Sequence, residues 1–150
     1  MRKLKTYGKM TQIGGRSMAC GIVVIGWDNK IGAIVEAKHP PQVKIDPAKV
    51  TTVYTMHTIS SRNPGSVTLR MHGLNVASYY AGPKINKCLV VVLGVNENPV
   101  LFKECLPRIM NQYFNNNSQI DYDKVLPKIY KMISKISEAG KVVKEIMDWF

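Results

Sequence analysis

The chain has 150 residues, of which 45% are hydrophobic and 21% are charged, so it can form one globular domain with its own core. These proportions exclude wholesale disorder and a collagen-like or low-complexity chain. No apolar run approaches the roughly 18 residues of a membrane-spanning helix, and no secretory signal follows the basic start. We therefore expect a folded domain without a transmembrane segment.

The net charge of +11 is concentrated toward one end of the chain. Residues 1–17 carry five Lys and Arg residues and no acid, whereas residues 18–150 carry 16 basic and 10 acidic residues without a dense run. We interpret residues 1–17 as a flexible basic arm and residues 18–150 as the folded domain. The arm allows peripheral contact with an anionic membrane, and the scattered charge elsewhere argues against nucleic acid as the main partner.

The cysteines predict a reducing compartment. Cys20, Cys88 and Cys105 cannot all pair, and their wide spacing matches no zinc-binding pattern. Without a secretory signal, we interpret them as small core residues of a cytoplasmic protein.

The folded domain is predicted to open with a β-hairpin. Apolar, β-branched runs at residues 20–25 and 31–38 predict two strands. Residues 27–30 contain Asp and Asn, which favour a tight turn between them. Pro40 and Pro41 end the second strand, because proline cannot continue a strand ladder.

A helix is predicted next. Asp46 and Pro47 are typical of a helix N-terminus. The threonines within residues 51–58 favour a strand over the same segment, so that alternative stays open. If the segment is helical, its buried face consists of Val50, Val53, Tyr54 and His57.

Three strands and two helices complete the predicted order. Apolar patterning predicts strands at residues 67–71, 76–81 and 88–95, and the last of these is the most apolar run, as expected of a central strand. A helix is predicted over residues 99–114, with a kink or restart at Pro107.

The apolar stripe of residues 121–150 predicts a long amphipathic helix at the end of the chain. Its residue Pro127 fits only near the first turn.

This order of elements resembles longin-like domains, a group within the SNARE-like or profilin-like α/β class. The resemblance covers about residues 19–150 and depends on element order more than on a short motif. The hairpin with residues 27–32 at its bend, the Gly82-Pro83 break and the apolar strand at residues 89–93 agree with it. The related roadblock fold opens with a helix, so the leading hairpin favours the longin-like fold.

The resemblance implies an α+β fold of the order ββαβββαα. It has a five-stranded antiparallel sheet with strand order 2-1-5-4-3, one helix on one face and two on the other. This order places residues 67–71 at an edge, where strands are protected or used for pairing with a partner. Arg70 and His72 either guard this edge or flank a dimer seam.

The candidate interaction surface combines the hairpin bend, the exposed side of the first helix and the edge strand. Trp27 packs over its own hairpin or anchors a partner, because exposed tryptophans are frequent hot spots. The candidate residues are Trp27, Asp28, Thr51, Thr55, Thr58, Thr68, Arg70 and His72.

The sequence shows no catalytic or cofactor-binding constellation. His39, His57 and His72 lie on three separate predicted elements without metal-ligand spacing, and Ser78 has no assigned base. We therefore expect no enzyme activity, no catalytic residues, no bound metal and no cofactor.

By resemblance, we expect a non-enzymatic protein–protein interaction module in the cytoplasm. Such an adaptor or subunit would bind a small GTPase or another longin- or roadblock-type protein, or form a homodimer, in a trafficking-like or regulatory assembly. The Lys- and Ile-rich composition is typical of archaeal proteins. Two other hypotheses stay open: the basic arm binds nucleic acid or anionic membrane, or the domain senses a small ligand.

Overall fold

A computed structural model describes residues 20–59, 61–114 and 120–147, with residues 140–147 as backbone only. The predicted arm, residues 1–17, lies outside the described residues. The described elements, in chain order, are β2 (Gly21–Asp28), β3 (Gly32–His39), α1 (Pro47–Thr58), β4 (Gly65–Met71), β5 (Leu74–Tyr80), β6 (Cys88–Val92), the 3₁₀-helix η1 (Pro99–Phe102), α2 (Cys105–Phe114) and α3 (Tyr122–Met147).

The five strands form one antiparallel sheet with the order β3-β2-β6-β5-β4. Counted along the chain, this is the predicted order 2-1-5-4-3, so the α+β class and the sheet order are confirmed. The two most apolar predicted strands, β2 and β6, lie together at the centre of the sheet. Each is covered on both faces, which explains why their sequences are continuous apolar runs instead of alternating patterns.

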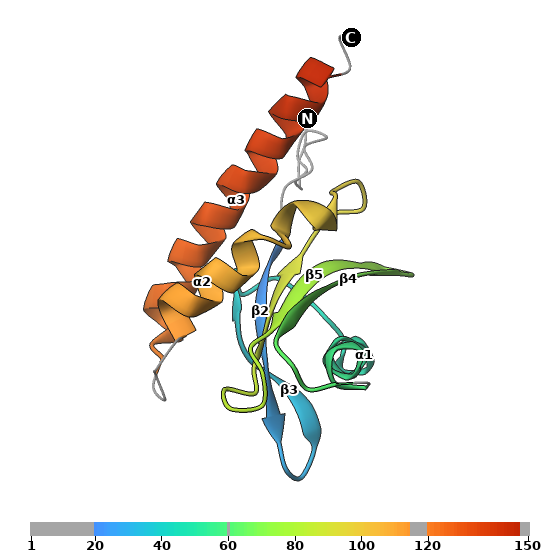
Figure 1. Cartoon of the computed structure of the whole chain (residues 1–150), viewed down its shortest axis with the longest axis vertical. Helices are drawn as coiled ribbons and strands as arrows, with labels where there is room; N and C mark the ends of the chain where they lie inside the picture. Colours follow the sequence, from blue (N-terminus) through green and yellow to red (C-terminus); the bar gives the residue numbers. More distant parts are fainter. Residues whose placement is uncertain (1–19, 60, 115–119, 148–150) are drawn as a thin grey trace, which may run out of the picture.

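Helix α1 lies on one face of the sheet and α2 and α3 lie on the other (Figure 1), and each face carries its own core. Side chains alternate along β2, so that Val23 and Ile25 pack in the core beside α1, while Ile22 and Val24 pack against η1, α2 and α3. One helix therefore covers one face, and two helices with the short 3₁₀-helix cover the other.

The predicted first helix is confirmed, and the strand alternative for the same segment is wrong. Asp46 accepts a hydrogen bond from the backbone N–H of Lys49 at 3.1 Å, which caps the N-terminus, and Pro47 is the first helical residue. The hydroxyls of Thr52 and Thr58 donate to carbonyl oxygens four residues earlier, which accommodates threonine in the helix. The buried face has the predicted composition: Val50, Val53, Tyr54 and His57.

The helical segment predicted over residues 99–114 restarts, as expected, but two residues before Pro107, and its first part is a 3₁₀-helix. The segment divides into η1 and α2, which starts at Cys105. Pro107 therefore lies in the first turn of α2, where its missing N–H costs no intrahelical hydrogen bond. Pro127 is inside α3 and lies beyond the first turn, further along than predicted.

All three cysteines are free, but only two are core residues. Cys88 is buried and Cys105 packs against the core beside α2 and α3. The prediction is wrong for Cys20, which is exposed because it precedes β2. Among the described helices, none has the length and hydropathy needed to cross a membrane.

Candidate functional site

One edge of the sheet carries an apolar groove. In the part of the chain that the structure describes, β3 pairs only with β2, so its other side is an open edge. A groove of about 410 Å³ lies between this strand and the start of α1. Seven of its eight lining residues have apolar side chains (Ile31, Ala33, Ile34, Val35, Ile45, Pro47 and Val50), and the eighth is Thr51.

The start of this edge lacks the usual protection against pairing. Edge strands are normally blunted by charged side chains, proline or bulges. Residues 32–35 contain neither charge nor proline. Val35, the last of them, is 37% exposed, and Ile31, which precedes them, is 74% exposed. The bulge and the charged residues of β3 come only later in the strand. This half of the edge is therefore suited to pairing with another strand.

The hairpin bend places Trp27 beside the groove. Trp27 is 46% exposed, and its indole stacks on Tyr54 of α1, with 5.0 Å between ring centroids. Gly32, at φ +90°, lies next to the same ring. Asp28 is used within the bend, where one carboxylate oxygen accepts N–H groups of Lys30 and Ile31 at 2.8 and 3.1 Å. Trp27 thus packs on its own domain and still presents part of its surface.

The candidate threonines of α1 divide by exposure. Thr51 is exposed and lines the groove, and Thr55 is exposed further along the helix. Thr58 is half-buried, and its hydroxyl is bonded to the carbonyl of Tyr54 at 3.1 Å. Only Thr51 therefore joins the groove directly.

The remaining candidates lie at the opposite edge of the sheet, on or beside β4. Arg70 donates to the backbone carbonyl of Glu97 at 2.7 Å, which attaches β4 to the loop before η1. Thr68 is half-buried, and His72 is exposed in the turn after β4. The predicted surface therefore consists of two separate patches, at β3 and at β4.

The sequence does not predict a polar cluster next to Trp27. Asn86 accepts hydrogen bonds on one side-chain oxygen from the hydroxyls of Tyr54 and Tyr80 at 2.8 and 2.9 Å, and from Arg62 at 3.1 Å. Its φ of +54° is in the left-handed region, which asparagine tolerates better than most residues. These residues come from α1, β5 and two loops, so no sequence spacing connects them.

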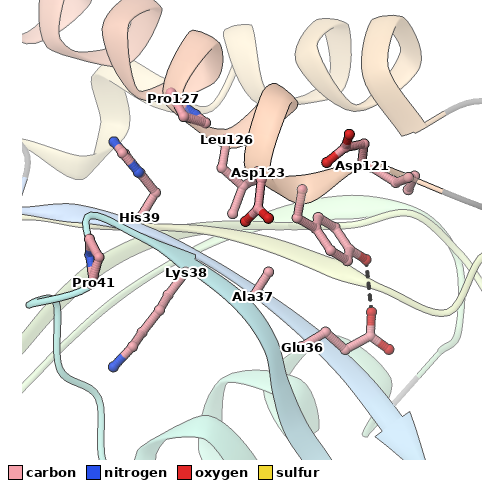
Figure 2. Close-up of a pocket in the computed structure, with 11 residues that line it drawn as sticks. Glu36, Ala37, Lys38, His39, Pro41, Asp121, Asp123, Leu126 and Pro127 are labelled. Carbon is pink, nitrogen blue, oxygen red and sulfur yellow. Dashed lines mark hydrogen bonds between the residues drawn. The ribbon is translucent and has the colours of Figure 1, made fainter.

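A second cavity, of about 500 Å³, lies between the end of β3 and the start of α3 (Figure 2). Three of its six polar lining residues are acidic: Glu36, Asp121 and Asp123. Figure 2 shows Asp123 pointing from α3 toward β3, while Lys38 points away from the cavity. The Lys38 ammonium instead donates to the carbonyl of Val43 at 3.1 Å.

A β-bulge positions Glu36 in this cavity. The register of β2 and β3 shifts after Val24, so that Glu36 has no partner across the ladder. Its carboxylate lies over Gly26, where a Cβ would collide with it. One carboxylate oxygen of Glu36 accepts from Tyr122 at 2.9 Å and pairs with Lys87. Burial raises the pKa of Tyr122, and the bonded carboxylate raises it further.

We expect Glu36→Ala to lower the free energy of unfolding by about 1–2 kcal/mol, because the half-buried Tyr122 hydroxyl and Lys87 lose their acceptor. Urea unfolding measures this change. Glu104→Ala is the matched control, since Glu104 is exposed and should change stability by less than about 0.5 kcal/mol. Equal effects of the two substitutions would contradict this role of Glu36.

The structure also places a base beside Ser78. His57 Nε2 lies 2.8 Å from the Ser78 hydroxyl, although the sequence assigned no base to this serine. Ser78 is 1% exposed and His57 8% exposed, so no substrate reaches the hydroxyl in this conformation. Burial lowers the pKa of His57 to about 4 and raises that of Cys88, which hydrogen-bonds Ser78, to about 12. His57 and Ser78 thus form a neutral, buried hydrogen bond that connects α1 to the sheet.

Within the described residues, no three His, Cys, Asp or Glu side chains gather in a way that could hold a metal ion. No known family model, curated protein or solved structure matches the chain.

Proposed function

We propose that this chain is a non-enzymatic protein–protein interaction module that binds its partner along β3 and the groove beside it. The observation that carries this proposal is the open, uncharged half of the β3 edge next to an apolar groove. An extended segment added to such an edge forms main-chain hydrogen bonds, and its alternate side chains enter the groove. Both features needed for strand addition therefore lie side by side.

The composition of this surface supports binding over catalysis. Trp27 stacks on the buried Tyr54 and presents part of its surface opposite the lining residue Ala33, and exposed tryptophans are enriched where binding energy concentrates. Two serine hydroxyls of the described residues that lie beside a base, Ser78 beside His57 and Ser137 beside Glu97, are both buried.

The partner class comes from the resemblance. The order of elements and the sheet order of longin-like domains support a cytoplasmic adaptor or subunit that binds a small GTPase or another longin- or roadblock-type protein. A second copy of this chain is the alternative occupant of the same edge, in which case the two β3 strands would pair.

Affinity capture from lysate of the source organism tests this proposal, with GDP or a non-hydrolysable GTP analogue added. We expect the wild-type chain to recover a small GTPase or a longin- or roadblock-type subunit, identified by mass spectrometry. Val35→Glu should lose that protein, because it places a charge in the groove at the edge.

Met132→Glu is the matched control. Met132 is 36% exposed, close to the value for Val35, but lies on α3 at the other face of the sheet. It should recover the same protein as the wild type. If Val35→Glu and Met132→Glu recover the partner protein equally, the proposed docking along β3 is wrong. It is also wrong if the wild type and both variants recover only nucleic acid or lipid.

A further inference from the structure

The bulge at Glu36 divides the open edge of β3 into two halves. Residues 32–35 pair with β2 in one regular register. In the described ladder Glu36 faces no residue of β2, and the pairing resumes with Ala37 opposite Val24. Side chains alternate along a regular strand, so this extra residue puts the two halves of the edge out of phase with each other.

Contacts with three parts of the chain hold the bulge in place. The carboxylate of Glu36 lies over Gly26 of β2, where the missing Cβ leaves room for it. The same carboxylate accepts from the Tyr122 hydroxyl of α3 at 2.9 Å and pairs with Lys87, which precedes β6. A docking strand therefore does not straighten the bulge without breaking these contacts.

A regular partner strand can follow only one half of this edge. A strand that pairs with residues 32–35 would meet residues 37–39 with the side chains of its two faces exchanged. The second half is also protected, because Lys38 is exposed and charged, and Pro40 and Pro41 follow the strand. Strand addition is therefore confined to residues 32–35.

This short edge determines which partner side chains reach the groove. Residues directly opposite each other across a ladder lie on the same face of a sheet. Ala33 and Val35 are alternate residues that line the groove, and Ile25, opposite Val35, packs in the core beside α1. The two partner residues opposite Ala33 and Val35 therefore face the groove. Its volume of about 410 Å³ accepts two large apolar side chains, since a cavity of about 150 Å³ holds a benzene molecule.

We propose that the partner contributes a short extended segment that pairs with residues 32–35 only and carries two apolar residues separated by one position. This inference rests on the proposed function and names the kind of segment that binds there. A loop or tail with an apolar-x-apolar motif meets the requirement. The whole β3 of a second copy does not, because it is eight residues long and contains the same bulge.

Selection from a random twelve-residue peptide library, with the full chain as target, tests this inference. We expect the selected peptides to share an apolar-x-apolar core and to vary outside it. Amide hydrogen exchange of the chain with a selected peptide then measures the length of the pairing. Binding should slow exchange in residues 32–35 and leave exchange in residues 37–39 unchanged.

Deletion of Glu36 tests the bulge itself. Because Glu36 has no partner in the described ladder, its deletion leaves the other pairs of β2 and β3 in one regular register. Protection by the peptide should then extend to residues 37–39. The affinity, measured by fluorescence anisotropy, should rise roughly tenfold, because about two more main-chain hydrogen bonds form.

Glu36→Ala is the matched control for the deletion. It loses the same contacts with Tyr122 and Lys87 but keeps the extra residue in the strand. Protection should therefore still end at Val35, and the affinity for the peptide should equal that of the wild type. If far-UV circular dichroism shows that the deletion variant is unfolded, the exchange pattern of the wild-type complex decides alone.

The outcomes distinguish the two proposals. Protection that reaches residues 37–39 in the wild-type complex would overturn the limit at Glu36 and leave docking along β3 intact. A wild-type dimer with both halves of β3 protected would overturn the limit in the same way. A selection that yields no peptide whose binding is lost in Val35→Glu would overturn both proposals.

Discussion

We expect the folded state to lose about 3 kcal/mol of stability from His57 alone as the pH falls from about 6.5 to about 4. The side chain is buried between α1 and the sheet beside Ser78 and Tyr80, and burial lowers its pKa to about 4. No charged group contacts it within the described residues, so the neutral form is favoured in the fold.

The loss of stability at low pH follows from the difference in proton binding between the folded and the unfolded chain. Between these pH values the unfolded chain binds a proton at His57 and the folded chain does not, so protonation favours unfolding. The contribution is fully present above pH 6.5 and is lost as the pH falls toward 4. Urea unfolding at a series of pH values measures it.

Substitutions separate His57 from the acids that titrate in the same range. His57→Gln can still hydrogen-bond Ser78, and its stability should depend less on pH than that of the wild type. His72→Gln is the control, because His72 is exposed. Parallel pH profiles for wild type and His57→Gln would show that His57 is not responsible.

Phe102→Ala is expected to lower the free energy of unfolding by about 3–5 kcal/mol. Phe102 is fully buried in the core that joins the sheet to α2 and α3, and it comes from the short 3₁₀-helix η1. Removing its ring leaves a cavity that the backbone of η1 cannot fill.

Val100→Ala, in the same 3₁₀-helix, is the matched control. Val100 is 57% exposed, so its truncation should change stability by less than about 0.5 kcal/mol. Comparable losses for both variants would contradict the assignment of Phe102 to the core.

Periodicity and helix-capping residues account for most of what the sequence predicts. The apolar runs of β2 and β6 indicate central strands because both their faces are covered. Asp46 and Pro47 locate the start of α1 because capping is a local interaction. The restart expected at Pro107 occurs two residues earlier, at Cys105, and the 3₁₀ geometry of η1 was missed because three-residue and four-residue helical spacing look alike over so short a segment.

The candidate site was less predictable because its residues meet only through tertiary structure. Thr51 was singled out and lines the groove, and Trp27 pairs across the ladder with the lining residue Ala33, but the β4 residues lie at the other edge of the sheet. The bulge at Glu36 appears only once the register of β2 and β3 is known. Arg62 and Asn86 meet across 24 positions of sequence, and neither carries a local signal.

The most direct test of docking along β3 is amide hydrogen exchange of the full chain, with and without the protein identified by capture. Pairing with a new strand gives hydrogen-bond partners to amides that face the open edge. We predict slower exchange in residues 32–35 and at the start of α1 in the complex. Protection confined to β4, or to residues 1–17, would contradict the proposed site.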